Sequence, residues 1–358
     1  MSTRSVPKPE ATYARKRRSA SGGSRMDDVA RLAGVSMITV SRVLNTPDKV
    51  AKTTREAVVA AIKKTGYVPN LTAGSLASNK SRIIGAIVPT IDNSIFAETV
   101  HGLSDTLATG GYQLLLGQSG YNESTEASLV EAFLGRRVDG LVLTGGVHSR
   151  ATRQRVRQSG VPVVETWDLP AKPIDMVAGF SNFEAGRTVG AYLLASGRLK
   201  LAFAGGPDER SAARLAGVQA ALTGQRGACL QVYRLEAGAA FEGGRRVVAV
   251  YAQAGKLPQA IFFGNDALAA GALMECQRRG IAVPAQLAIV GFADLAIAAA
   301  MEPTLTTVRV PTRRMGEDAA RMLLARLNHT DHPDGKDGQV VDSTVHDLGF
   351  ELVVRASA

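Results

Sequence analysis

The apolar positions of residues 26–67 recur at the spacing of short amphipathic helices. Gly34 can adopt the positive φ that ends a first helix, and Ser36 is a typical N-cap for a second helix that runs to about Asn45. The inward face of the first helix holds Val29, Ala30 and Ala33, and that of the second holds Val40, Val43 and Leu44. This sharp helix-to-helix connection predicts a helix-turn-helix.

A third helix is predicted from Thr53 onward. Glu56 follows Thr53 by three residues, which is the spacing of a capping box. The residues expected to pack this helix against the other two are Ala57, Val58, Ala61 and Ile62. The pattern therefore predicts a small all-α domain over residues 26–67.

From residue 83 onward the pattern changes to short apolar runs that alternate with helical stretches. The runs with strand character are IIGAIVP, YQLLLG, GLVLTG, VPVVET and DMVAGF, and then LKLAFAGG, QAIFFGND and LAIVGF. Helical stretches between them include FAETVHGLSDTLATG and DALAAGALMECQRRG. This alternation predicts two α/β lobes with parallel sheets covered by helices, and a ligand site between the lobes at the carboxyl edges of the strands.

The positive charge is concentrated near the N-terminus. The net charge is +10 over 358 residues, but residues 1–25 carry seven Lys or Arg against one Glu, and residues 26–82 carry nine against four acidic residues. The remaining residues 83–358 are therefore close to neutral. The positive electrostatic field of the N-terminal residues would attract the phosphates of DNA. Residues 1–25 also lack apolar periodicity, so we expect a disordered basic tail that adds phosphate contacts or is a simple solvated extension.

A small helix-turn-helix domain can place its second helix in the major groove, although an ordinary three-helix bundle without a ligand has the same spacing. The predicted DNA-reading residues are Ser36, Met37, Ile38, Thr39, Ser41, Arg42 and Asn45, together with Tyr67. The segments DVARLAGVSMITVSRVLN, KTTREAV and GYVPN resemble, in order and spacing, the headpiece of the lac/gal repressor family. This resemblance favours DNA binding over the plain bundle.

The same resemblance implies a hinge over residues 68–82. In repressors of this family such a segment folds when two copies meet on DNA, and a leucine from each copy enters the minor groove. Leu76 matches that leucine, Ala73 matches the small residue that lets the helix approach the groove, and Asn70 can cap the helix. Gly74 departs from the usual pattern, and a plain flexible linker is the alternative.

The resemblance extends along nearly the whole remaining chain, residues 83–358. The segments that carry it are VPTIDNSIFAE, VPVVE, GFSNFEAG, DERSAARLAG, FGNDALAAGA and VPAQLAIVGF, and they are similar to the gluconate-operon branch of the family. Membership of this branch implies a bilobed core akin to periplasmic sugar-binding proteins, which binds an effector and forms a homodimer. The expected effector is gluconate or a related sugar acid.

A sugar acid requires a cation for its carboxylate, hydrogen-bonding groups for its hydroxyls and an apolar wall. Arg210 matches the arginine of the gluconate branch, and Arg214 matches a position at which many relatives contact effector. The expected hydroxyl partners are Glu165, Asp168, Asn265 and Asp266, and the expected apolar wall is Phe96 and Trp167. Ala293 occupies a position where many relatives carry an aspartate that binds a sugar hydroxyl, which argues against ordinary neutral-sugar recognition.

Other functional classes fit the sequence less well. The common nucleotide and hydrolase motifs, G-x-G-x-x-G after a strand, Walker A and G-x-S-x-G, do not occur, so no enzyme and no cofactor are predicted. Cys229 and Cys276 match no metal or redox spacing, and His329 and His332 are expected in a solvated polar loop. With neither a signal peptide nor a membrane span, the expected location is the cytoplasm, which also argues against a transport protein.

The sequence thus predicts a repressor of sugar-acid catabolic genes that its effector releases from operator DNA. The alternatives are a family member that answers to another sugar acid, a sugar phosphate or a neutral sugar, or an activator.

Overall fold

The computed structural model describes residues 24–68, 80–91, 94–331 and 344–358. The chain divides into two compact units, Met1–Ser78 and Asn79–Ala358, which we call the headpiece and the core. Pro69–Asn79 lies outside the described residues, so the predicted hinge residues Asn70, Ala73 and Leu76 do too.

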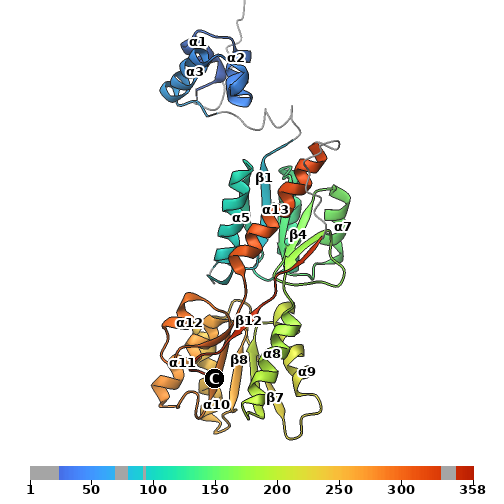
Figure 1. The fold of residues 1–358 in the computed structure, drawn as a ribbon, viewed down its shortest axis with the longest axis vertical. Coiled ribbons are helices and arrows are strands. Elements are labelled where there is room, and N and C mark those ends of the chain that lie inside the picture. The colour runs from blue at the N-terminus through green and yellow to red at the C-terminus, as the bar shows by residue number, and fades with distance from the viewer. Residues whose placement is uncertain (1–23, 69–79, 92–93, 332–343) are drawn as a thin grey trace, which may run out of the picture. The chain divides into compact units, whose positions relative to one another are not determined.

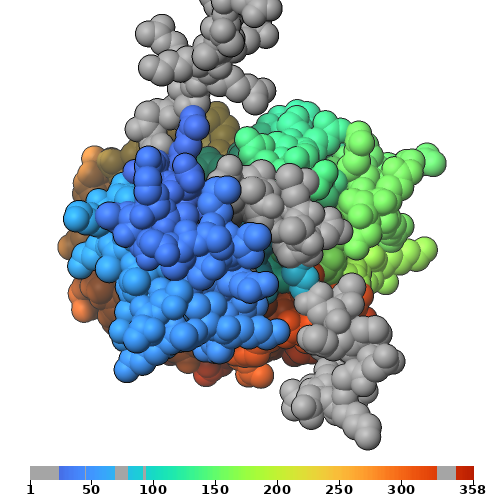
Figure 2. All heavy atoms as spheres, turned by 90° about the horizontal axis from the view of Figure 1, so that it is seen from above, coloured from blue at the N-terminus to red at the C-terminus, as the bar shows by residue number. Residues whose placement is uncertain are grey.

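The headpiece is the predicted helix-turn-helix with a third helix packed against it. Gly34 has a φ of 67° at the end of the first helix, and the Ser36 hydroxyl accepts a hydrogen bond from the backbone N–H of Thr39 at the start of the second. The helices are α1 (Met26–Ala33), α2 (Met37–Asn45) and α3 (Lys52–Thr65), with a 3₁₀ turn η1 (Pro47–Lys49) between α2 and α3. Figure 2 shows the described headpiece, in blue, as one continuous packed body.

Two details of the third helix differ from the prediction. It begins at Lys52 with Ala51 as N-cap, and the cap has no side-chain hydrogen bond, so Thr53 and Glu56 form no capping box. Val58 and Ala61 are buried as expected, but Ala57 is exposed. Because Ala51 is the N-cap, Thr53 is already the second residue of the helix and cannot cap it.

The first lobe of the core has a parallel six-stranded sheet with the order β11-β5-β4-β3-β1-β2. Helices α5 and α13 cover one face, and α6 and α7 cover the other (Figure 1). The strands are β1 (Ile83–Val88), β2 (Gln113–Gln118), β3 (Gly140–Thr144), β4 (Val163–Thr166), β5 (Met176–Gly179) and β11 (Val345–Asp347). The helices are η2 (Ser94–Phe96), α5 (Ala97–Thr109), α6 (Glu123–Gly135), α7 (Arg150–Ser159) and α13 (Thr312–Asp331).

The second lobe repeats this plan with the strand order β12-β10-β9-β8-β6-β7, in which only β12 is antiparallel to its neighbour among the described pairs. Helices α8 and α9 cover one face, and α10 and α11 cover the other. The strands are β6 (Lys200–Gly205), β7 (Cys229–Arg234), β8 (Ala260–Phe263), β9 (Ala288–Ala293), β10 (Thr306–Arg309) and β12 (Glu351–Val353). The helices are α8 (Asn182–Ala195), α9 (Glu209–Leu222), α10 (Phe241–Gln253), α11 (Asp266–Arg279) and α12 (Ala296–Ala300).

The described chain crosses between the lobes three times, as the ribbon in Figure 1 shows. The crossings lie between β5 and α8, between β10 and α13, and between β11 and β12. One apolar cluster continues from lobe to lobe and includes Phe96, Trp167, Phe180, Phe203 and Phe292. The bilobed α/β prediction is therefore confirmed, with strands β7, β10, β11 and β12 added.

The structure also places one of the two histidines and both cysteines that the sequence brought to notice. His329 lies in helix α13 rather than in a loop, whereas His332 is outside the described part. Cys229 and Cys276 are free thiols, the first exposed and the second buried. A search of the described residues finds no helix long and apolar enough to cross a membrane, and no group of three or more metal-binding side chains.

Glycines allow α8 and α9 to approach each other at backbone distance. A Cβ on Gly186 would lie 2.0 Å from the carbonyl oxygen of Arg214, and a Cβ on Gly217 would lie 2.0 Å from that of Phe183. No side-chain rotation can relieve a clash with a backbone atom. These two contacts therefore fix the position of α9 and of the residues at its N-terminal end.

Gly217→Ala should destabilise the core because the new methyl group must push α9 away from α8. A loss of about 1–3 kcal/mol in the free energy of unfolding is expected for such overpacking, measured by urea denaturation. Gly135→Ala is the matched control: Gly135 ends α6, is exposed, and has open space around its Cβ position. That control should be neutral or stabilising by up to about 1 kcal/mol. Equal stability of the two variants would contradict the close approach.

Candidate functional site

The outward face of α2 forms a continuous surface of side chains in the headpiece. Ile38 is 66% exposed and Met37 52% exposed, and Arg42 is exposed one turn further along. Ser36 and Thr39 are joined by a hydroxyl–hydroxyl contact of 3.0 Å at the start of the helix, and Ser41 is half-buried. Polar, apolar and cationic groups are thus available on one helix face, as direct reading of base edges requires.

Tyr67 does not belong to this surface. Its side chain is only 9% exposed and belongs to the headpiece core with Val29, Val40 and Val58. The prediction that Tyr67 belongs to the exposed reading surface is wrong, because its ring is packed in the core that stabilises the headpiece. Asn45 ends α2, but its side chain is outside the described part of the structure.

A cavity between the two lobes brings together five of the predicted effector residues. Phe96 and Trp167 come from the first lobe, and Arg210, Arg214 and Asn265 come from the second. The other main lining residues, which were not predicted from the sequence, are Ile95, Tyr121, Asp208, Ser211, Glu236, Leu268 and Phe292.

The N-terminal end of α9 supplies most of the polar wall. Asp208 is the N-cap and accepts a hydrogen bond from the backbone N–H of Ser211 at 3.2 Å. Arg210 is 8% exposed, its Nε lies 3.4 Å from Oδ1 of Asp208, and its guanidinium carbon lies 5.4 Å from the centre of the Phe96 ring. Arg210 therefore reaches from the second lobe to the first, at a helix end that favours anions.

Arg214 lies deeper in the same wall and is 6% exposed. It donates hydrogen bonds to the side-chain oxygen of Asn182 and, at 3.3 Å, to the carbonyl of Gly264, and it stacks 4.2 Å from the centre of the Phe292 ring. Burial lowers the pKa of Arg214 to about 10, against the attraction of Asp208. It remains a cation at neutral pH.

Three groups on α9 carry incomplete hydrogen bonding. Within the described part of the chain, four buried side-chain atoms have no hydrogen-bond partner: Nη1 of Arg210, Oγ of Ser211, Nε of Arg214 and Oε1 of Glu165. The three from α9 belong to residues that line the cavity. Unsatisfied buried donors are costly, so this wall is suited to a ligand that supplies acceptor oxygens.

Neighbouring contacts fix the remaining walls of the cavity. The indole N–H of Trp167 donates to Oγ1 of Thr99 at 3.2 Å, and the Phe96 and Trp167 rings meet edge to face at 5.0 Å. These rings form a rigid apolar wall.

Burial alone would raise the pKa of Asp208, but Arg210 and Arg214 hold this pKa below its ordinary value, so Asp208 is ionised.

Three predicted hydroxyl partners lie away from the cavity lining. Glu165 is fully buried in β4, where its Oε2 accepts a hydrogen bond from the backbone N–H of Ile174 at 2.6 Å. Oδ1 of Asp168 accepts a hydrogen bond from Asn182, which also binds Arg214. Asp168 therefore acts only through other residues, and Glu165 faces its own lobe.

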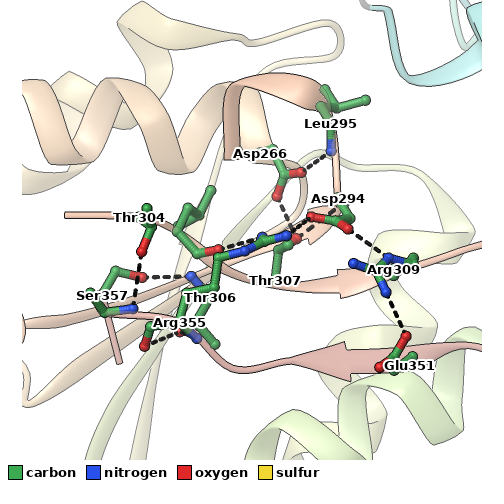
Figure 3. A network of polar contacts seen from close by, with 12 residues as sticks. Asp266, Asp294, Leu295, Thr304, Thr306, Thr307, Arg309, Glu351, Arg355 and Ser357 are labelled. Carbon is green, nitrogen blue, oxygen red and sulfur yellow. Dashed lines mark hydrogen bonds and ion pairs between the residues drawn. The ribbon is translucent and has the colours of Figure 1, made fainter. Parts of the chain in front are cut away.

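Asp266 is the third predicted hydroxyl partner that does not line the cavity. It follows β8, but its carboxylate turns into the second lobe, accepting hydrogen bonds from the hydroxyl of Thr307 at 2.6 Å and the backbone N–H of Leu295 at 2.7 Å (Figure 3). Burial raises the pKa of Asp266 to about 6. It anchors the turn after β9, whose last residue, Ala293, has a φ of 108°. Asn265, the N-cap of α11, keeps its place on the cavity wall.

The lining residues that were not predicted have only weak indications of their role in the local sequence. Ser211 directly follows Arg210, and Tyr121 and Phe292 lie at strand ends, so a rule that includes all polar or aromatic residues at the carboxyl edge would have found them. Asn182 opens α8 just after a lobe crossing, and its role as a bridge between Trp167, Asp168 and Arg214 depends on tertiary structure alone.

Two family models match the chain. Residues 25–70 match the model for bacterial regulatory proteins of the lacI family, and residues 191–357 match the periplasmic binding protein-like domain. A helix-turn-helix headpiece on a two-lobed binding core defines the chain as a DNA-binding transcriptional regulator rather than an enzyme.

Relatives along the whole chain agree with this class. The HTH-type transcriptional regulator GntR of Escherichia coli K12 is 34% identical over 91% of this chain and 96% of its own length. A LacI-family regulator from Silicibacter pomeroyi has a similar structure, with a TM-score of 0.84 at 29% identity over 93% of this chain and 99% of the other. The lac repressor dimer bound to operator gives a TM-score of 0.76 at 25% identity, over 94% and 99% of the two chains. The chain belongs to the lacI family of bacterial regulatory proteins.

Proposed function

We propose that this regulator is a dimeric repressor that a sugar acid of the gluconate class releases from its operator. The observation that carries the effector half is the set of unpaired polar atoms on α9, Nη1 of Arg210, Oγ of Ser211 and Nε of Arg214. A carboxylate can accept hydrogen bonds from both guanidinium groups and the hydroxyl. It would also compensate the positive charge of two buried arginines.

The rest of the cavity suits a polyol chain. Asn265 uses its Oδ1 to accept from the backbone N–H of Leu268 at 2.9 Å, which leaves its amide nitrogen to donate to a hydroxyl. Asp208 and Glu236 supply acceptors, and Phe96 and Trp167 supply an apolar face for the C–H groups. This combination supports a sugar acid over a neutral sugar, because a neutral sugar would leave Asp208 alone to compensate two arginines.

The headpiece supports the other half of the proposal. Its exposed α2 face and its basic sequence fit an operator duplex, with one headpiece of a homodimer on each half-site. We further propose that the regulator acts in the cytoplasm, where its DNA target and a catabolic sugar acid meet.

Arg42→Ala should weaken operator binding by about 1–3 kcal/mol per half-site and relax specificity at one base pair, because an exposed arginine on a reading helix can bind guanine through two hydrogen bonds. Binding to an operator and to its single-base variants, measured by fluorescence anisotropy, tests this. Arg31→Ala, which removes an exposed arginine on α1, is the control. Full affinity and full discrimination in Arg42→Ala would show that another residue reads the operator.

Arg210→Ala should reduce gluconate affinity by about 2–5 kcal/mol, because the carboxylate would enter the cleft without its partner. Operator binding should remain normal, but gluconate should no longer release the operator at concentrations that release the parent. Calorimetry on the core and anisotropy on the full chain measure the two effects.

Arg226→Ala is the matched control, because Arg226 is exposed in the turn after α9. It should respond to gluconate as the parent does. If Arg210→Ala also responds like the parent, or if the parent binds no sugar acid, the effector assignment is wrong while the operator assignment stands.

A further inference from the structure

A buried ionic cluster lies in the first lobe beside the effector cleft. His148 follows β3, and its side chain is fully buried. Its Nδ1 lies 2.9 Å from Oε1 of Glu126 on α6, and its Nε2 lies 3.2 Å from the carbonyl oxygen of Gly145. On the far side, Oε1 of Glu165 lies 3.5 Å from the same Nε2.

Both ring nitrogens of His148 therefore face atoms that only accept hydrogen bonds. A neutral imidazole has one N–H, so one of its nitrogens would present a lone pair to the carboxylate or to the carbonyl. An imidazolium has two N–H groups and satisfies both acceptors. The geometry thus selects the protonated ring.

The charges around the ring agree with this choice. The charged groups that face it are Glu126 from α6, Glu165 from β4, and Arg153 from α7, whose Nη1 lies 3.6 Å from Oε1 of Glu165. Burial raises the pKa of Glu165, but an imidazolium at His148 and the charge of Arg153 favour its ionised form. Two cations then balance two carboxylates, whereas with a neutral ring one carboxylate is uncompensated in a buried site. Burial alone would lower the pKa of His148, but the hydrogen bond and charge of Glu126, with the charge of Glu165, raise it above its ordinary value.

This cluster borders a second cavity that adjoins the effector cleft. Glu126 and Gly145 line a second cavity, which Arg210 also lines. A Cβ placed on Gly145 would lie 4.0 Å from Nη1 of Arg210, the unpaired nitrogen of the effector wall. The other ionisable groups of this second cavity are Tyr121, Glu123, Asp208 and Glu209.

We propose that His148 is a positioning residue of the effector site, whose proton on the imidazolium holds the Gly145 loop against Glu126 and ties the binding of an acid to proton uptake. This inference rests on the proposed sugar-acid function. Loss of the proton leaves a single N–H for the two acceptors. When that N–H donates to Glu126, the Gly145 carbonyl is freed, and Glu126 stays negative with no cation beside it on the wall of the second cavity. An anionic effector then meets both a displaced loop and an added repulsion.

The sign of the pH dependence follows. Because the folded-state pKa of His148 is raised, the proton is held below and around the ordinary pKa and is lost as the pH rises through the folded-state value. Gluconate affinity should therefore fall with rising pH. The fall is roughly tenfold for each unit by which gluconate raises the pKa of His148.

The first measurement needs no ligand. The full chain, labelled with ¹⁵N-histidine, is titrated by NMR, and the His148 signal is assigned by its disappearance in His148→Gln. We expect both ring nitrogens to be protonated at about pH 7. A neutral His148 ring at that pH would overturn the inference whatever the effector is.

The second measurement is calorimetry with gluconate between about pH 6 and about pH 9, below the pKa of Arg214, in buffers of different ionisation enthalpy. The parent should take up protons on binding only at pH values near and above the folded-state pKa of His148, and it should lose affinity as the pH rises through that region. His148→Gln should bind weakly at every pH without proton uptake. His101→Gln, which removes an exposed histidine on α5, should behave as the parent.

A double variant separates charge from packing. If the unpaired carboxylate causes the loss, Glu126→Gln combined with His148→Gln should recover part of the affinity and make it independent of pH. A parent whose gluconate affinity changes by less than about twofold over this range would overturn the linkage. Absence of gluconate binding at every pH would instead overturn the proposed function, while the NMR titration would still decide the charge of His148.

Discussion

Two arginines buried at one helix end are the constraint on which the site depends. Arg210 and Arg214 sit on α9 with only part of their hydrogen-bonding capacity used, and Asp208 is the nearby carboxylate that both of them attract. Buried cations of this kind cost free energy unless they are paired. Other contacts hold the two arginines in place despite this cost. Close glycine contacts fix α9 against α8, and the Arg214 guanidinium stacks on the Phe292 ring. A ligand with a carboxylate relieves the cost.

The contacts at the lobe crossings allow such a ligand to affect the arrangement of the two lobes. Asn182, just after the first crossing, holds both Arg214 and the backbone of Trp167. Arg309, just before the second crossing, pairs with Asp294 at 2.7 Å and with Glu351, just after the third, at 2.8 Å (Figure 3). The first crossing is therefore tied to the cleft through Arg214, and the second and third crossings are tied to each other and to Asp294 after β9. A ligand that favours one arrangement of the lobes can shift the equilibrium between arrangements only by its differential affinity for them.

The sequence predicted those features that follow from local pattern. Ser36 and Gly34 marked the limits of the turn, and long apolar runs such as IIGAIV marked the central strands. It missed β7, β10, β11 and β12, which are short or half-exposed, and it misplaced Glu165 and Asp266, because a carboxylate after or within a strand can turn into its own lobe. Nothing in the local sequence distinguishes Asp266, bound to Thr307, from Asn265 beside it, which lines the cavity. The pairing of His148 with Glu126 and Glu165 likewise arises only from tertiary structure.

The most direct test of the account is a closed thermodynamic cycle on the full chain, with an operator selected from random duplexes. Operator affinity is measured with and without saturating gluconate, and gluconate affinity is measured with and without saturating operator. The account predicts that gluconate weakens operator binding by a factor corresponding to about 1–3 kcal/mol, and that operator weakens gluconate binding by the same factor. An operator affinity that gluconate leaves unchanged, although gluconate binds the core, would contradict it.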